Sequence, residues 1–219
     1  MDLDETLHYS AKFKQKAWKN ILNFFGYEWK ISAANPTHEL EGINPEKWPN
    51  IGLSPREFTT QLLKNLDLDL KNFNHAGITE GVHTEEQLLS FLEKEWSDRL
   101  ISAAREMDVE EVPGAVGMVQ KLYAEDYPMG VVTQAPTEYA EIILGKLGLT
   151  NAEKPYISAI VGGEMVSRPK PDPEGLVKAT QLVWLNQLQL DYPIDKVPIE
   201  EYIYLTRNLV KPLAFIGDL

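Results

Sequence analysis

Apolar residues recur at helical spacing through the first hundred residues of the chain. Between residues 11 and 25 they lie three or four apart and stop before Gly26, a pattern that predicts an amphipathic helix. Capping boxes that start at Ser54 and Thr84 precede two further apolar series, so two more helices are expected there. No strand-like alternation is visible between residues 10 and 108, and this segment is predicted to be all-helical.

The pattern changes after Val112, where helical spacing alternates with short apolar runs bounded by Gly and Pro. Helices are expected to open near Pro113, Pro136 and Pro173. The apolar runs predict buried strands at Met129–Val132, Ile157–Val161 and Leu213–Ile216. Strands that alternate with helices indicate βαβ units around a parallel sheet. We therefore predict an α/β core formed by residues 1–10 and 109–219, with residues 11–108 inserted as a helical domain.

Composition and charge argue against several classes of protein. The 219 residues are 43% hydrophobic and 25% charged, and no stretch approaches the roughly 18 apolar residues of a membrane span. A formal net charge of -12 and the lack of a basic stripe argue against a nucleic-acid partner. The chain has no cysteine and opens on no signal-peptide pattern, so a cytoplasmic protein is expected.

Four short motifs carry candidate chemistry. They are Asp2-Leu3-Asp4-Glu5-Thr6, Thr133 after an apolar run, Lys170 between two prolines, and Gly217-Asp218 after the last apolar run. Each has a structural alternative when taken alone. An Asp-x-Asp pair is often a solvated loop, a Thr after a strand is often a turn or cap residue, and most lysines are solvated. Only the combination and its order point to a shared site.

The four motifs in this order resemble the haloacid dehalogenase superfamily. The sequence between these motifs is similar to the phosphoglycolate phosphatase and β-phosphoglucomutase branch. The similar segments are Val112-Pro113-Gly114, Gly130–Thr133 and Gly162-Gly163-Glu164. The resemblance implies a Rossmann-like three-layer core with a parallel sheet and an inserted all-helical cap domain. It also implies an active site at the carboxyl ends of the strands, where open α/β sheets bind ligands.

The resemblance further implies a role for each motif residue. Asp2 would be the nucleophile that forms an aspartyl-phosphate, and Asp4 would be the general acid and base. Thr133, with its own and neighbouring backbone N–H groups near a helix start, would bind the phosphoryl group together with Gln134, and Lys170 would neutralise its charge. The implied reaction is hydrolysis of a small phosphorylated metabolite.

A divalent cation belongs to the same expectation. Mg²⁺ prefers hard oxygen ligands, and the resemblance assigns it the carboxylate of Asp2, the backbone carbonyl of Asp4, and Asp218. The four histidines share no metal-ligand spacing and are expected to be surface or packing residues: His8, His38, His75 and His83.

Three alternatives stay open from the sequence. A phosphoglucomutase would pass the same phosphoryl group to a second sugar hydroxyl. A 2-haloacid dehalogenase would not need the second aspartate, and Asp4 is present. Glu5 replaces the more usual Gly of the family's first motif. The third alternative is a catalytically inactive fragment, because only Met1 precedes Asp2 and the chain stops at Leu219 before the family's second motif acid. On these grounds the chain is expected to be truncated at both ends.

Overall fold

The chain forms two compact units. The structure is a computed structural model that describes residues 1–24, 30–31, 40–41, 54–65, 82–150, 155–187 and 216. The first unit, called here the core unit, comprises Met1–Ser10 and Asp108–Leu219, and the second, the inserted unit, comprises Ala11–Met107. None of the helices in these described ranges has both the length and the apolar composition needed to cross a membrane.

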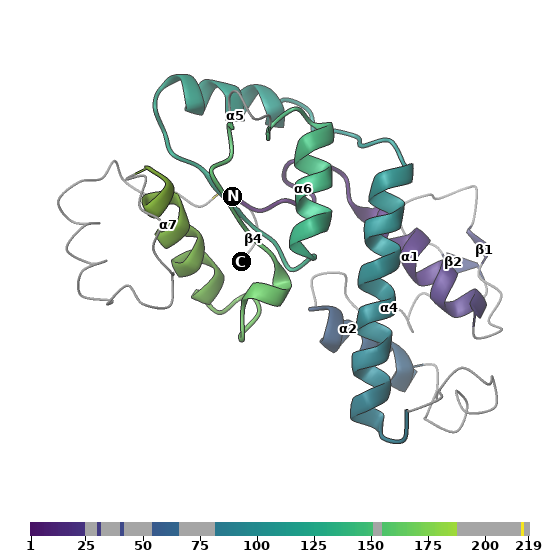
Figure 1. Ribbon diagram of the computed structural model, residues 1–219. Helices are drawn as coiled ribbons and strands as arrows, with labels where there is room; N and C mark the ends of the chain where they lie inside the picture. Colours follow the sequence, from purple (N-terminus) through teal and green to yellow (C-terminus); the bar gives the residue numbers. More distant parts are fainter. Residues whose placement is uncertain are drawn as a thin grey trace. The chain divides into compact units, whose positions relative to one another are not determined.

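The inserted unit is built around one long helix. Helices α1 (Ala11–Phe24) and α2 (Pro55–Asn65) pack against the apolar side of helix α4 (Glu85–Glu106) (Figure 1). Those apolar side chains of the three helical series whose burial the structure describes are buried, and the rings of Trp18 on α1 and Phe58 on α2 lie with their centroids 5.1 Å apart. Packing of these faces, rather than helix propensity alone, stabilises helices of this length.

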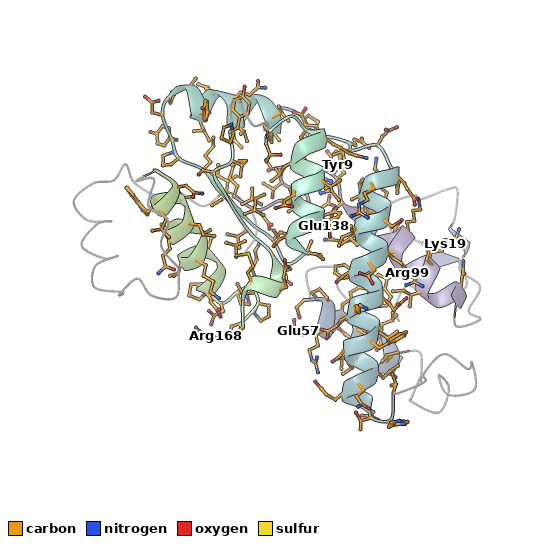
Figure 2. The ribbon with its side chains drawn as sticks, in the orientation of Figure 1. Tyr9, Lys19, Glu57, Arg99, Glu138 and Arg168 are labelled. Atoms are coloured by element: carbon orange, nitrogen blue, oxygen red, sulfur yellow. The ribbon has the colours of Figure 1, made fainter. Side chains whose placement is uncertain are left out.

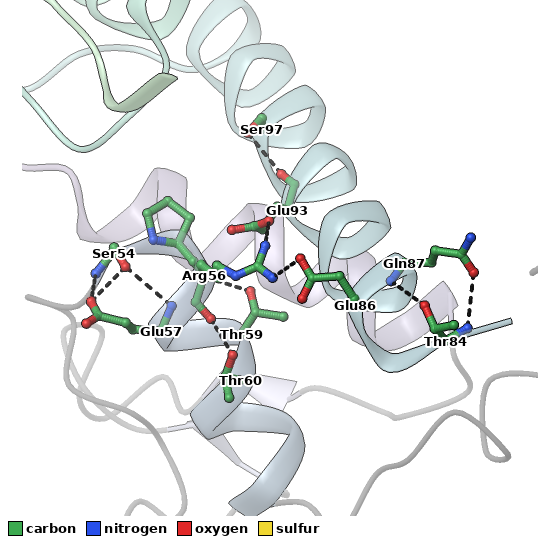
Figure 3. Close-up of polar contacts among 11 residues, drawn as sticks. Ser54, Arg56, Glu57, Thr59, Thr60, Thr84, Glu86, Gln87, Glu93 and Ser97 are labelled. Carbon is green, nitrogen blue, oxygen red and sulfur yellow. Dashed lines mark hydrogen bonds and ion pairs between the residues drawn. The ribbon is translucent and has the colours of Figure 1, made fainter. Parts of the chain in front are cut away.

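Both predicted capping boxes are present (Figure 3). The backbone N–H of Gln87 donates to the Thr84 hydroxyl over 3.2 Å, and the Gln87 side chain accepts from the Thr84 backbone N–H. Ser54 and Glu57 make the equivalent pair at the start of α2. These bonds use helix donors that lack an intrahelical acceptor, which is why the two starts could be predicted from local sequence.

One feature of the inserted unit differs from the prediction. Strand β1 (Lys30–Ile31) pairs antiparallel with β2 (Leu40–Glu41), so the segment between residues 11 and 108 is not wholly helical. Two residues per strand are too few to produce a visible alternation of apolar and polar positions. The sequence pattern therefore could not reveal this ladder.

The core unit contains a parallel sheet between helices. Strand β3 (Gly130–Val132) pairs with β4 (Ala159–Val161) in parallel, Val131 opposite Ile160. Figure 1 shows α6 (Thr137–Lys146) and α7 (Glu174–Gln187) on either side of this ladder, and both contact it. Buried Val132, Val161 and Ala179 join the sheet to α7. This is the Rossmann-like α/β arrangement that the alternation of elements predicted.

The first residues of the chain extend the sheet. The Met1 nitrogen donates to the Gly130 carbonyl over 2.7 Å, and Val132 N–H donates to the Met1 carbonyl over 2.8 Å, which is a parallel pattern. On the other side, Asp2 N–H donates to the Ile216 carbonyl over 2.8 Å. The spatial order is therefore β4, β3, Met1–Asp2, Ile216. The chain order reverses next to Asp2, and such a switch point is where doubly wound sheets bind ligands.

Two details of the helices differ from the prediction. Helix α5 (Ala115–Ala124) begins two residues after Pro113, because Gly114 has a φ of 84°, a left-handed conformation outside the helix. The apolar series after Pro173, which includes Leu176, Val177 and Val183, predicts a buried Val177 in α7, but its side chain is 36% exposed. The predicted strand Leu213–Ile216 lies outside the described residues except for Ile216.

Candidate active site

The strand end at the switch point carries an ion pair between Asp2 and Lys170. The two residues are far apart in the sequence, yet Lys170 Nζ lies 2.7 Å from Asp2 Oδ2. Each side chain is only 13% exposed, so Lys170 is not a solvated surface lysine. The other carboxylate oxygen, Oδ1, accepts the Leu3 backbone N–H over 2.8 Å. A carboxylate with a fixed orientation and an adjacent cation is therefore present where the sheet predicts a ligand site.

The protonation of Asp2 reflects opposing effects. Burial raises the pKa of the Asp2 carboxyl above its ordinary value, and the nearby charge of Asp4 adds to the rise. The hydrogen bond and the charge of Lys170, with the Leu3 N–H, act in the opposite direction and lower that pKa. Lys170 is thus the group that most favours the ionised form of the largely buried Asp2 carboxyl.

Glu174 at the start of α7 holds the loop that carries Lys170. Its carboxylate accepts the backbone N–H groups of Ser167 and Arg168, each over 3.0 Å. Lys178 pairs with the same carboxylate over 2.8 Å and also donates to the Met165 carbonyl over 2.6 Å. Figure 2 labels the exposed Arg168 on this loop. Hydrogen bonds to the charged form, with that of Lys178 the largest contribution, lower the pKa of Glu174 to about 2.

We expect Glu174→Gln to loosen the Lys170 loop and to lower the thermal unfolding midpoint at neutral pH. The pKa of Glu174 in the folded protein lies below its ordinary value. The ionised carboxylate therefore stabilises the fold fully above about pH 4.5, and this stabilisation is lost as the pH falls towards about 2. The difference in thermal unfolding midpoint between wild type and variant should therefore be largest at neutral pH and shrink in acid. Glu141→Gln on the exposed side of α6 is the matched control. A difference that does not change with pH would contradict this role.

Thr133 and Gln134 follow directly after β3, the strand that pairs with Met1. Thr133 N–H already donates to the Val161 carbonyl over 2.9 Å, and the Thr133 hydroxyl accepts Ala135 N–H over 3.0 Å. The backbone N–H expected to bind phosphate is thus used by the sheet, whereas the hydroxyl still has a proton to donate. The Gln134 side-chain oxygen is buried without a hydrogen-bond partner among the described residues. A side-chain amide can also donate through nitrogen, so both side chains can bind a phosphoryl oxygen.

Two glycines allow the β4 end to approach this loop. A Cβ on Gly163 would collide with the Gln134 carbonyl oxygen, and one on Gly162 would collide with Thr137. Gly163 N–H donates to the Ala135 carbonyl over 2.9 Å, and the Glu164 carboxylate accepts Thr137 N–H at the start of α6. The Gly-Gly-Glu sequence thus fixes the loop that carries Thr133.

Asp4 contacts a residue that the sequence analysis did not assign to the site. Its Oδ1 lies 3.2 Å from His8 Nε2, and the same nitrogen lies 3.2 Å from the hydroxyl of Tyr139 on α6. His8 and Tyr139 are both 0% exposed. The expectation of a surface or packing role for His8 is therefore incomplete, because the imidazole is a buried hydrogen-bonding partner. The i, i+4 spacing of Asp4 and His8 was the only signal available in the sequence.

The surroundings keep Tyr139 neutral. Burial raises the pKa of the Tyr139 hydroxyl well above its ordinary value, and the negative charges of Asp4 and Glu5 raise it further. The group is therefore an uncharged phenol, able both to donate and to accept a hydrogen bond.

Comparison with known proteins identifies the family of the chain. Residues 50–192 match the haloacid dehalogenase-like hydrolases. The chain belongs to this family. Among curated relatives of this haloacid dehalogenase-like hydrolase, pyrophosphatase PpaX from Listeria monocytogenes is 34% identical over 73 residues, which are 33% of this chain and 32% of PpaX. The chain thus matches about a third of the length of that relative.

Solved structures of low sequence identity share the fold. A hydrolase from Pseudomonas syringae aligns with a TM-score of 0.56 at 22% identity, covering 84% of this chain and 68% of that one. CbbY from Rhodobacter sphaeroides, solved in complex with phosphate, aligns with a TM-score of 0.56 at 15% identity, covering 86% of this chain and 71% of the other. These alignments support the α/β fold of the core unit.

The oxygen donors of this haloacid dehalogenase-like hydrolase suit a hard cation. The Asp2 carboxylate and the Asp4 backbone carbonyl both belong to the Asp-x-Asp motif at the switch point, and both are ligand types that Mg²⁺ prefers. Within the described ranges, no group of three or more His, Asp or Glu side chains gathers to hold a metal. The third predicted ligand, Asp218, lies outside the described residues. The donor chemistry fits the expected ion through Asp2 and Asp4.

Proposed function

We propose that the protein hydrolyses small phosphomonoesters through an aspartyl-phosphate on Asp2, with Mg²⁺ as cofactor. The observation that carries this proposal is the Asp2–Lys170 pair, 2.7 Å apart at the switch point of the sheet. A phosphoryl dianion repels a carboxylate, so attack requires a cation at the same place, and the chain supplies one.

The first half-reaction transfers the phosphoryl group to the protein. A carboxylate oxygen of Asp2 forms a bond to phosphorus while the bond from phosphorus to the ester oxygen breaks. Asp4 donates a proton to the departing oxygen, which leaves as an alcohol. Lys170, the Thr133 hydroxyl and the Gln134 amide donate hydrogen bonds to the phosphoryl oxygens as charge gathers on them.

The second half-reaction restores the enzyme. Asp4, now ionised, takes a proton from water as the water oxygen attacks phosphorus, and the bond between phosphorus and the Asp2 oxygen breaks. The products are inorganic phosphate and the free Asp2 carboxylate. Using one group first as acid and then as base returns every proton to its starting place. The two half-reactions replace one difficult displacement with two easier ones.

Mg²⁺ would be held by the Asp2 carboxylate, the Asp4 backbone carbonyl and Asp218. When bound, it supplies positive charge that neutralises phosphoryl oxygens in the transition state. The substrate class, a small phosphorylated metabolite, is supported by a relative that is named a pyrophosphatase. We further propose that the inserted unit is the cap that selects this substrate.

The proposal predicts phosphate release that depends on a hard divalent cation. The complete protein should release phosphate from members of a panel of phosphomonoesters with Mg²⁺, and EDTA should stop turnover until Mg²⁺ is restored. Phosphate is measured colorimetrically over time. A 2-haloacid added to the same protein should yield no halide. Turnover that resists the chelator, or halide release without phosphate release, would refute the proposed function.

A further inference from the structure

We propose that His8 is a positioning residue that orients the Asp4 carboxylate for proton transfer, with Tyr139 fixing the imidazole. The inference rests on the proposed function, because Asp4 is the proton donor and acceptor of that reaction. It gives a role to His8 and Tyr139, which the proposed mechanism does not otherwise use.

The local fold places His8 against Asp4. Glu5 N–H donates to the His8 carbonyl over 2.9 Å, and Leu7 N–H donates to the Leu3 carbonyl over 2.9 Å, so the chain turns back on itself after the Asp-x-Asp motif. The Leu7 carbonyl in turn accepts Val112 N–H over 3.1 Å. The backbone around His8 is therefore fixed on two sides, and its ring has little freedom to leave Asp4.

The side-chain contacts give the ring a defined role. His8 Nε2 lies 3.2 Å from Asp4 Oδ1, and an Nε2–H donated to that oxygen selects one orientation of a carboxylate that is 13% exposed. Proton transfer requires the donor to be within hydrogen-bond reach of the leaving oxygen, so a freely rotating carboxylate would lose much of its effect. The contact thus acts on catalysis through Asp4 and not through the substrate.

Tyr139 links this contact to the phosphoryl-binding loop. The residue lies in the first turn of α6, which follows directly after the Thr133–Pro136 loop, and its hydroxyl is 3.2 Å from His8 Nε2. The two rings are 5.9 Å apart, centre to centre, and tilted by 52°. Asp4 and Thr133, which would act on opposite ends of the breaking bond, are therefore tied to the same helix start.

Burial argues against a purely space-filling role for His8. The neighbouring Leu3 and Leu7 are also 0% exposed, and an apolar side chain would fill such a place without cost. A buried imidazole requires hydrogen-bond partners, and removing them leaves a polar group unsatisfied. Asp4 and Tyr139 supply such partners to Nε2, one of the two ring nitrogens.

The test compares two esters in the complete protein with Mg²⁺. An alkyl phosphate such as glycerol phosphate needs a proton on its leaving oxygen, whereas nitrophenyl phosphate has a good leaving group and needs little help. We expect His8→Leu to lower kcat/KM for the alkyl ester by about tenfold or more, within the roughly 10²-fold or larger loss expected for Asp4→Asn. The kcat/KM for the nitrophenyl ester should fall far less, because this ratio reports the first half-reaction.

Companion variants separate positioning from folding. His8→Gln keeps an N–H donor close to the Nε2 position and should recover part of the lost activity. Tyr139→Phe should also lower kcat/KM more for the alkyl ester than for the nitrophenyl ester, but by a smaller factor. Tyr123→Phe, which removes an exposed hydroxyl on α5, should leave kcat/KM for both esters unchanged. His8→Leu combined with Asp4→Asn should cost no more than Asp4→Asn alone, because both act through one proton transfer.

Each remaining outcome contradicts the inference. Suppose that His8→Leu folds with an unchanged unfolding midpoint. If it then lowers kcat/KM equally for both esters, or for neither, His8 does not position Asp4. If His8→Leu fails to fold, equal effects on both esters in His8→Gln and Tyr139→Phe lead to the same conclusion. A wild-type protein that hydrolyses neither ester overturns the proposed function itself, a result distinct from an active enzyme that is indifferent to His8.

Discussion

Asp2→Asn is expected to reduce phosphate release to background, a loss on the order of 10⁴-fold or more. The amide keeps the size of the side chain and can still accept the Leu3 N–H and contact Lys170, but it cannot form an acyl phosphate by direct attack. Steady-state phosphate release with Mg²⁺ is the measurement. Near-normal activity would show that Asp2 is not the nucleophile.

Thermal unfolding of the same variant separates lost chemistry from lost fold. Because burial raises the pKa of the Asp2 carboxyl, keeping it ionised works against folding above its ordinary titration range. Removing that charge relieves the cost of burying it but leaves Lys170 without its anion, so the two effects oppose each other and the unfolding midpoint should change little at neutral pH. A large fall in the midpoint would mean that the activity loss reports unfolding and that the Asp2–Lys170 pair is mainly structural.

Lys170→Ala is expected to lower kcat by roughly 10² to 10³-fold, the size of loss typical when one group that stabilises transition-state charge is removed. Unlike most lysine substitutions it should also destabilise the fold, since Asp2 loses its cation in a site only 13% exposed. We expect a cost of about 1 to 3 kcal/mol, below the 3 to 5 kcal/mol of a fully buried pair. Urea unfolding at neutral pH measures it.

The pH dependence of that cost has a definite sign. Without Lys170 the pKa of Asp2 should rise further, so the destabilisation is complete at neutral pH and shrinks as acid protonates Asp2. Lys121→Ala, on the exposed side of α5, is the matched control and should alter neither rate nor stability. A Lys170→Ala protein with wild-type rate and stability would return Lys170 to an ordinary surface role.

The elements that the sequence predicted best are those specified by neighbours along the chain. The boxes at Ser54 and Thr84 are satisfied within one helical turn, so their signal is local. The ends of β3 and β4 were also visible, because each short apolar run stops at a Gly or a polar residue. The placement of Lys170 and Asp2 in one site came from resemblance to a family and not from any pattern in the chain itself, and their ion pair was seen only in the structure.

The parts that were missed depend on contacts distant in sequence. Tyr139 and His8 are 131 positions apart, and each looks like core when viewed alone. Thr133 N–H was expected to bind phosphate, but sheet pairing to Val161, a partner invisible in sequence, uses it first. Sequence patterns predict which face of an element is apolar, but they do not predict which buried polar groups contact each other.

Glu5 shows how a departure from the family pattern is accommodated. Its φ of 56° is left-handed, which explains why a glycine is usual there. The Glu5 carboxylate accepts both the backbone N–H and the hydroxyl of buried Ser10, over 2.8 and 2.9 Å. These two bonds offset backbone strain of order 1 to 2 kcal/mol. The sequence identified the departure, and only the structure supplied the compensation.

The most direct test of the account is to identify the phosphorylated residue. Asp4→Asn protein is mixed with nitrophenyl phosphate and Mg²⁺, because this ester needs little acid assistance while loss of the general base slows hydrolysis of the intermediate. The reaction is quenched in acid, reduced with borohydride and mapped by mass spectrometry. The account predicts an acid-stable phosphoryl group on Asp2, converted by borohydride to homoserine at position 2 and absent from Asp2→Asn. A phosphoryl group on any other residue would contradict it.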